Sequence, residues 1–398
     1  MNTAPLPQGG VARPPRLESL DLLRGLIMVV MALDHTRDYF HAATLHGLDS
    51  MDLVHTSPWI FFTRFITHYC APIFSFLAGA GVFLAARNRT KRELSWFLVT
   101  RGLWLVLLEL TFVKWAWTFQ YDLHLFWGST LWSLGWSMVA LAGLIHLPFR
   151  AVAATGLILV FGHNALDGLQ PADFGSWGWL WNILHVRGTF VIVPGYSFRS
   201  GYSLLPWIGV MTSGYAFGAL YQLDAAQRQK WLIRLGLGAL ALFVLLRGGN
   251  LYGDLHPWSP QARPGFTFLS ILNCTKYPPS LSYVLLTIGP AMLLLAWLER
   301  GTHAWLRPLL AYGRVPFFYY MLHIPLIHGL AVLQNQLRFG RSDFVGPFAT
   351  GIAPTGAGVS LPWVWLIWLG VVISLYPLCR WFAALKQRRR DLTWLSYF

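Results

Sequence analysis

The stretch RLESLDLLRGLIMVVMALDHTRDYFH (Arg16–His41) decides the fold class. Between Arg24 and Asp34 it is apolar without a break, and on both sides of this run it carries ionisable residues. A helix needs about 20 mainly apolar residues to span a lipid bilayer. Residues 20–40 have that length, which predicts a first membrane-spanning helix with charged groups near both of its ends.

The composition of the whole chain is typical of a membrane protein. Of its 398 residues, 55% are hydrophobic and only 12% are charged, and the mean hydropathy is +0.49. Soluble domains carry roughly a quarter charged residues, so this chain has too few to cover a water-exposed surface. The 21 Trp residues fit membrane–water interfaces, where Trp is enriched. A soluble domain, a disordered chain and a disulfide-stabilised scaffold are therefore disfavoured.

Ten apolar segments predict an all-α, polytopic integral membrane protein with about ten (10 or 11) transmembrane helices. The segments lie at 20–40, 58–85, 94–118, 127–147, 150–166, 204–222, 232–248, 281–298, 309–336 and 361–384. The ninth contains Pro316 and Pro325, so we expect a kink or a break into two helices there.

The distribution of Lys and Arg predicts the orientation in the membrane. With the N-terminus inside, 20 of the 30 basic residues fall on one side, in short loops and at helix ends. Basic residues concentrate on cytoplasmic loops, so both termini are predicted to be cytoplasmic, in the cell inner membrane. The net charge of +14 is then explained by topology, and no nucleic-acid partner is expected.

The chain is predicted to contain one domain between two tails. Residues 1–15 are a flexible cytoplasmic N-terminal tail, residues 16–385 are a single transmembrane domain, and residues 386–398 are a basic cytoplasmic C-terminal tail. The long connections are predicted to face the outside, and they lie at 167–203, 249–280 and 337–360.

The outer end of the first helix carries the densest group of ionisable residues. Asp34 and His35 lie about 15 Å beyond Arg24 along a helix, which places them at mid-membrane or in the outer leaflet. Ionisable groups are costly there unless they are paired or hydrated, so they are functional candidates. His35 precedes Asp38 by three residues, and we predict that Asp34 or Asp38 orients His35 as a general base. A helix end whose charges pair only with one another would have the same sequence.

Arg64 and His68 lie on one face of the second predicted helix, because they are four residues apart. Together with the first helix they predict a polar pocket, in which Arg64 or His68 would stabilise an oxyanion. A buried His68 that is hydrogen-bonded to the backbone is an equally good interpretation. A metal site needs at least three ligands, and the sequence marks no third one here, so no metal is predicted.

Other polar residues in apolar segments have two interpretations each. Guanidinium groups bind phosphate through paired hydrogen bonds, which makes three residues at the cytoplasmic helix ends candidates for phosphate binding: Arg24, Arg101 and Arg314. For any single one, a topology anchor whose charge reaches the membrane surface is the simpler explanation. His323 and His328 are predicted to be buried histidines satisfied by the core, since five residues of spacing put them on different helix faces.

The first helix also carries a motif. Arg16, Ser19, Asp21, Arg24 and Gly25 match the pattern Arg-x-x-Ser-x-Asp-x-x-Arg-Gly. Through this motif the chain resembles the heparan-α-glucosaminide N-acetyltransferase catalytic-domain family, within the broader transmembrane acyltransferases. Later segments resemble bacterial members of the family, and they are THYCAPIFSFLAG, PWIGVMTSGYAFG, TKYPPSLSYVLLTIGP and YGRVPFFYYMLHIPLIH. The similarity runs from residue 16 to about residue 330.

The resemblance implies transfer of an acetyl or related acyl group from cytoplasmic acyl-CoA to an amino sugar or hydroxyl outside the cytoplasm. A functional Asn position of the family falls on His35, and its His position falls on His41 or His68, depending on how the second span is aligned. Which of the three histidines is the base stays open. Direct transfer and a route through an acyl-histidine both fit.

The sequence therefore predicts a membrane-bound acyltransferase that uses acyl-CoA and no metal. Its catalytic candidates are His35, Asp34, His68, Arg64, Asp38 and His41, and its candidates for acyl-CoA binding are Arg24, Arg314 and Arg101. The expected partners are acyl-CoA, a glycan acceptor and the lipid bilayer, and a homodimer stays open. The alternative is a proton-coupled transporter or flippase that uses the intramembrane Asp and His residues as a relay.

Overall fold

The computed structural model of this protein describes residues 17–301, 304–389, 391–392 and 394–395. The predicted N-terminal tail (1–15) and Arg16 lie outside the described residues. The same holds for part of the predicted C-terminal tail, at 390, 393 and 396–398.

Each of the ten segments predicted to span the membrane contains helix. In chain order the helices of these segments are α1 (Glu18–Phe40), α3 (Pro58–Phe65), η1 (Ile66–Tyr69), α4 (Cys70–Ala86), α5 (Lys91–Leu108), η2 (Glu109–Val113), α6 (Lys114–Thr118), α7 (Thr130–Leu144), α8 (Phe149–Gly162), η3 (His163–Leu166), α10 (Leu204–Phe217), η5 (Gly218–Gln222), α11 (Ala225–Gly248), α13 (Leu281–Leu298), α14 (Leu309–Gly313), α15 (Pro316–Phe339) and α16 (Leu361–Arg388). Short helices in the connections are α2 (Ala42–Leu45), η4 (Pro171–Trp177), α9 (Gly178–Leu184), α12 (Phe266–Leu272) and η6 (Ala304–Leu306).

By length and composition, seven helical stretches among the described residues could cross a membrane, fewer than the ten predicted. The difference has a physical cause in each case. α1 carries charged residues at both ends, and α7 has only 15 residues. α10 continues directly into η5, but the combined helix contains Pro206, glycines and polar residues that lower its hydropathy. The seven stretches and the low charge identify a mostly helical membrane protein.

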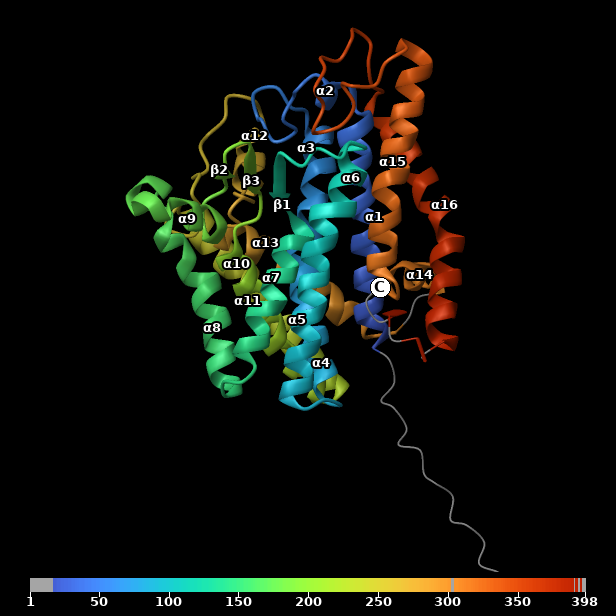
Figure 1. The fold of residues 1–398 in the computed structure, drawn as a ribbon. Coiled ribbons are helices and arrows are strands. Elements are labelled where there is room, and N and C mark those ends of the chain that lie inside the picture. The colour runs from blue at the N-terminus through green and yellow to red at the C-terminus, as the bar shows by residue number, and fades with distance from the viewer. Residues whose placement is uncertain (1–16, 302–303, 390, 393, 396–398) are drawn as a thin grey trace, which may run out of the picture.

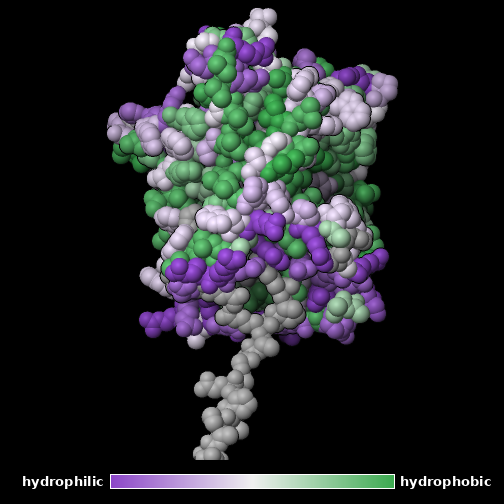
Figure 2. Space-filling view, turned by 90° about the vertical axis from the view of Figure 1, so that its right-hand side faces the viewer, coloured by the Kyte–Doolittle hydropathy of each residue, from purple (hydrophilic) through white to green (hydrophobic). Residues whose placement is uncertain are grey.

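The long helices run side by side and form one bundle (Figure 1). α1 lies inside it, in contact with α4, α14, α15 and α16. α1 begins and α16 ends at the same end of the bundle, whereas the long connections gather at the opposite end (Figure 1). On the face drawn in Figure 2, hydrophobic side chains cover the middle and hydrophilic ones gather toward the two ends, as a bilayer would require.

The predicted ninth span is broken in two. α14 ends at Gly313 and α15 begins at Pro316, while Pro325 lies inside α15. The short α14 crosses α1 at very close range, because a Cβ atom on Gly25 would lie 2.0 Å from the carbonyl oxygen of Leu309. A Cβ on Gly313 would likewise lie 1.7 Å from a carbonyl oxygen of α1. Glycine at both positions therefore lets the motif end of α1 pack directly on the break.

A small sheet in the connections was not predicted. β1 (Leu125–Gly128) pairs in parallel with β3 (Tyr196–Ser200), which pairs antiparallel with β2 (Gly188–Val193). β2 and β3 form a hairpin whose turn contains Gly195 at a φ of 86°. Because β1 takes up residues 125–128, α7 begins at Thr130, three residues later than the predicted span.

Arg247 at the end of α11 holds the connection between α11 and α13 together. Its side chain is 2% exposed and donates hydrogen bonds to four backbone carbonyls, those of His256, Ser270, Ile271 and Asn273. It also lies 3.6 Å from the carboxylate of Asp254. The guanidinium of Arg247 thus provides hydrogen-bond donors for buried carbonyl groups in this mostly irregular connection.

We expect Arg247→Met to lower the stability of the folded protein by about 3 kcal/mol, since it leaves buried carbonyls and a carboxylate unpaired. The thermal unfolding midpoint of the purified protein in detergent measures the change. Arg234→Met, at an exposed position on the same helix, is the control and should alter stability by less than about 0.5 kcal/mol. Equal midpoints for the two variants would contradict the assigned role of Arg247.

Candidate active site

A polar cavity of about 210 Å³ lies beside the C-terminal half of α1. We call it the outer cavity. Its charged and polar lining comes from α1, the second span, the starts of α7 and α10, the connection before α13, and α15. It consists of Asp34, His35, Asp38, Arg64, Thr67, Ser129, Thr130, Tyr202, Lys276, Tyr277 and Tyr320. Four of the six predicted catalytic residues therefore share one cavity: Asp34, His35, Asp38 and Arg64.

The carboxylate of Asp34 is the centre of an ion-pair network. Both of its oxygens accept from Nη1 of Arg64, and Arg37 lies 2.8 Å from it. The hydroxyl of Thr67 donates a further hydrogen bond at 2.9 Å, and Arg37 also pairs with Asp38 at 2.6 Å. The network ties α1 to the start of the second span, and it satisfies charges that would otherwise be costly inside a membrane.

His35 is oriented by a second histidine, not by a carboxylate as predicted. Nδ1 of His323 lies 3.0 Å from the carbonyl oxygen of Tyr319. Because a carbonyl oxygen only accepts hydrogen bonds, Nδ1 of His323 carries the hydrogen. Nε2 of the neutral His323 ring is then unprotonated and accepts. That Nε2 lies 2.8 Å from Nδ1 of His35, which must therefore donate. Neutral His35 is left with an unprotonated Nε2, the form that a general base requires.

His323 is buried and hydrogen-bonded, as predicted, but its hydrogen bond to His35 was not predicted. The signal that could have found it is depth: His323 lies about 10 Å along α15 from the break. His35 lies about 15 Å along α1 from Arg24, so both histidines lie well inside their helices and not at the ends that meet at the break. His328 fits the prediction, since its Nδ1 is bonded to the Ala116 carbonyl at 2.9 Å and its ring stacks on Phe119.

Two predicted histidines lie away from the outer cavity. The ring of His68 packs edge-on against Tyr283, whose hydroxyl donates to the His68 carbonyl at 2.6 Å. His41 follows the last residue of α1, and its Nδ1 lies 3.3 Å from the Thr44 hydroxyl. Neither lines the outer cavity. Among the three candidate bases, only His35 does.

Lys276 and Tyr277 also line the outer cavity, although neither was among the predicted site residues. The hydroxyl of Tyr277 lies 3.3 Å from that of Tyr202. Burial alone would raise the pKa of Tyr277, but the charges of Lys276 and Arg64 outweigh it and lower the pKa. This wall of the cavity therefore favours negative charge.

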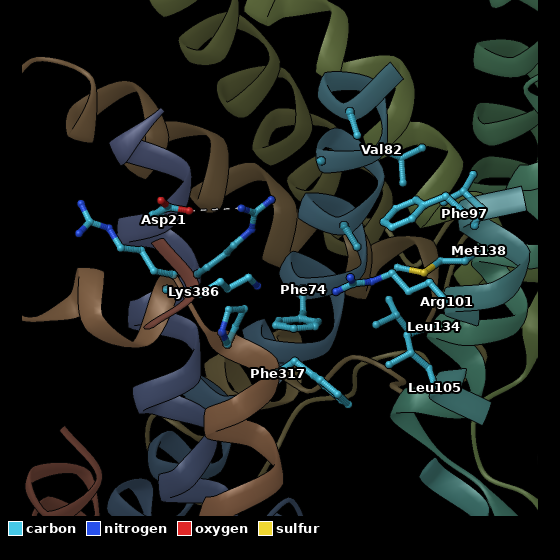
Figure 3. Close-up of a pocket in the computed structure, with 18 residues that line it drawn as sticks. Asp21, Phe74, Val82, Phe97, Arg101, Leu105, Leu134, Met138, Phe317 and Lys386 are labelled. Carbon is cyan, nitrogen blue, oxygen red and sulfur yellow. Dashed lines mark hydrogen bonds and ion pairs between the residues drawn. The ribbon is translucent and has the colours of Figure 1, made fainter. Parts of the chain in front are cut away.

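A second cavity, of about 310 Å³, lies at the other end of α1. We call it the inner cavity. It brings together Arg24, Arg101 and Arg314, all three predicted acyl-CoA-binding residues, and adds Lys386. Figure 3 shows Arg101 and Lys386 on opposite sides of it with Phe74 between them. Four cationic side chains against one carboxylate, that of Asp21, give the inner cavity a positive charge that would favour an anion.

Arg24 is held in place from two sides. Its Nη1 lies 3.4 Å from Asp21, three residues earlier on α1, and its Nη2 donates to the Leu77 carbonyl of α4 at 3.1 Å. Arg314 lies in the break between α14 and α15, 3.8 Å from Glu18. The motif and the broken ninth span thus present their guanidinium groups to the same cavity.

A void of about 10 Å³ separates the two cavities. It shares Phe74 and Leu134 with the inner cavity, and it shares Ala71, Thr130 and Tyr202 with the outer cavity. The two cavities therefore approach each other along α4 and α7.

The fold and these cavities define a polytopic membrane protein with a basic cavity and a histidine-containing polar cavity toward opposite ends of α1. The family model described as heparan-alpha-glucosaminide N-acetyltransferase, catalytic, matches residues 16–247, more than half of the chain. The chain belongs to this family, which confirms the resemblance seen in its motif and implies a membrane acetyltransferase. A comparison with curated proteins gives no match. Lys276, Arg314 and His323 lie beyond the matched residues.

Proposed function

We propose that this protein is an inner-membrane acyltransferase that moves an acetyl or related acyl group from cytoplasmic acyl-CoA to an acceptor outside the cytoplasm. The acceptor is an amino sugar or a hydroxyl group of a glycan. The proposal includes ten membrane crossings with both termini in the cytoplasm, so that α1, α7 and α10 also cross. Family membership supports the reaction class, and the helix ends gathered in Figure 1 are compatible with the topology.

One observation carries the proposal: a basic cavity and a histidine-containing cavity meet inside the bundle across a void of about 10 Å³. A donor with a phosphate-rich end and a reactive thioester at the tip of a long arm fits this arrangement. The phosphates would bind Arg24, Arg101, Arg314 and Lys386. The arm would pass Phe74 and bring the thioester to His35.

In the direct route, the acceptor nitrogen or oxygen attacks the thioester carbonyl carbon and gives its proton to Nε2 of His35. The tetrahedral intermediate then collapses, the C–S bond breaks, and the CoA thiolate takes up that proton. Arg64 and Lys276 would stabilise the negatively charged oxygen of the intermediate. In the covalent route, the same Nε2 attacks the thioester carbonyl carbon first, the C–S bond breaks and the CoA thiolate leaves. The acceptor then attacks the acyl carbon, the bond to Nε2 breaks, and the acceptor's proton goes to the thiolate, so both routes depend on the free lone pair of Nε2.

The test is transfer of labelled acetyl groups from acetyl-CoA by the purified protein, with glucosamine and a sugar that offers only hydroxyl groups as acceptors. We expect labelled product with at least one of them and saturable binding of CoA. If CoA does not bind, the enzyme assignment is wrong. Uptake of the sugar into proteoliposomes driven by a proton gradient, without acetylation, would favour the transporter instead.

A further inference from the structure

We propose that His163, Asp167 and His185 form a binding site for a divalent transition-metal cation of the zinc class. One ligand atom from each residue lies within 4.8 Å of the other two. None of the three lines the inner or the outer cavity. The proposed site is therefore independent of the acyl-transfer reaction.

The backbone brings these residues together by folding the connection after α8 back on itself. His163 begins η3 and Asp167 follows its last residue, whereas His185 follows the last residue of α9. Trp181 of α9 closes the fold by donating from Nε1 to the Leu169 carbonyl at 2.9 Å. Its ring also packs on that of His185, at 5.2 Å between ring centroids.

The two imidazole rings are buried with most of their nitrogens unpaired. His163 is 3% exposed, and neither of its ring nitrogens makes a hydrogen bond of good geometry. Among the described residues, the backbone of Pro279 is the one backbone group that interacts with its ring. His185 is fully buried, with Nε2 bonded to Asp167 at 2.9 Å and Nδ1 unpaired. Buried polar groups nearly always have a partner, and a cation between the rings would supply one.

The donor set selects the kind of cation. Two imidazole nitrogens and one carboxylate oxygen suit Zn²⁺, whereas Ca²⁺ and Mg²⁺ prefer sites made only of oxygen ligands. Ligands of a tetrahedral zinc ion lie roughly 3.3 Å apart, so binding would draw these atoms closer through side-chain rotation. Three protein ligands leave a fourth position for water.

A second ring of contacts holds the carboxylate and links it to the rest of the bundle. Nδ2 of Asn164 donates to the second oxygen of Asp167 at 2.8 Å. Oδ1 of the same amide accepts from the backbone N–H of Leu281, at the start of α13, at 2.9 Å. Such outer contacts are typical of metal ligands. The cation would thus clamp the α8–α9 connection to the N-terminus of α13, four residues after Tyr277.

The first measurement is the zinc content of the full chain, purified with an affinity tag that contains no histidine and dialysed after zinc loading. We expect about one zinc per chain, and at least a tenfold lower content in His163→Gln and in Asp167→Asn. His55→Gln is the matched control, because His55 forms an exposed His–Asp pair with Asp52 at 2.6 Å. Wild-type protein with no more zinc than His163→Gln would overturn the proposal.

Wild-type protein alone provides a second measurement, because a variant of a buried histidine can fail to fold. Co²⁺ in place of zinc should give the intense visible absorption of a four-coordinate ion, and excess Mg²⁺ should not abolish it. Zinc should also raise the thermal unfolding midpoint, and a chelator should reverse the rise. Absence of both the absorption and the shift would equally exclude the site.

Discussion

Replacing His35 by alanine is expected to lower kcat for acyl transfer by about 10³-fold, the scale of a lost general base. The KM for acyl-CoA should change little, because His35 lies in the outer cavity, away from the basic residues of the inner cavity. Single-turnover transfer from labelled acetyl-CoA by purified protein measures the effect. Retention of more than about a tenth of the wild-type rate would remove His35 from the mechanism.

His68→Ala and His328→Leu are the controls for this prediction, since both residues are buried histidines outside the outer cavity. Each should retain transfer within a few-fold of wild type.

His323 is assigned as a positioning residue that acts through His35. His323→Leu should lower kcat and move the pH profile of kcat. The amide oxygen of His323→Asn can still accept from Nδ1 of His35, so this variant should have a kcat and a pH profile close to those of wild type.

The second large effect is expected at Arg24. Loss of one charge-assisted contact to phosphate costs about 1.5–3 kcal/mol, so Arg24→Ala should raise the KM for acetyl-CoA by about 10- to 100-fold. The decisive readout is a comparison of donors. With acetyl-pantetheine, which lacks the adenosine phosphates, wild type and Arg24→Ala should have the same KM.

Arg87→Ala is the matched control for Arg24. Its guanidinium donates to the Tyr221 carbonyl at 3.0 Å, and it does not line the inner cavity. It should leave the KM for acetyl-CoA unchanged. If Arg24→Ala raised the KM for acetyl-pantetheine as much as the KM for acetyl-CoA, the role of Arg24 would be to hold α1 against α4 and not to bind phosphate.

Much of the helical framework could be predicted from the sequence, because apolar length is a local property. The ten apolar segments are all helical, and the break at Pro316 lies where the proline pattern predicts it. Helix length and hydropathy alone do not give the number of crossings, since α7 has only 15 residues and α10 with η5 is interrupted by Pro206 and several polar residues. The small sheet was missed because β1 pairs with a strand about 70 residues further along the chain.

The candidate site was predicted in part, for a related reason. Asp34, His35 and Asp38 lie close in sequence, and helical spacing is enough to group them. The partner of His35 is 288 residues away, and helical periodicity reports which face a residue occupies but not which helix packs there. For the same reason, His68 lies in the predicted second span but faces Tyr283 instead of the outer cavity.

Transfer between the two cavities is tested most directly by the side of the membrane on which each substrate is used. Inside-out vesicles that contain the protein would receive labelled acetyl-CoA on the outside, with an amino-sugar acceptor enclosed in the lumen. We expect labelled, acetylated acceptor in the lumen with wild-type protein, and none above background with His35→Ala. Product that forms only when donor and acceptor are on the same side would contradict transfer between the two cavities.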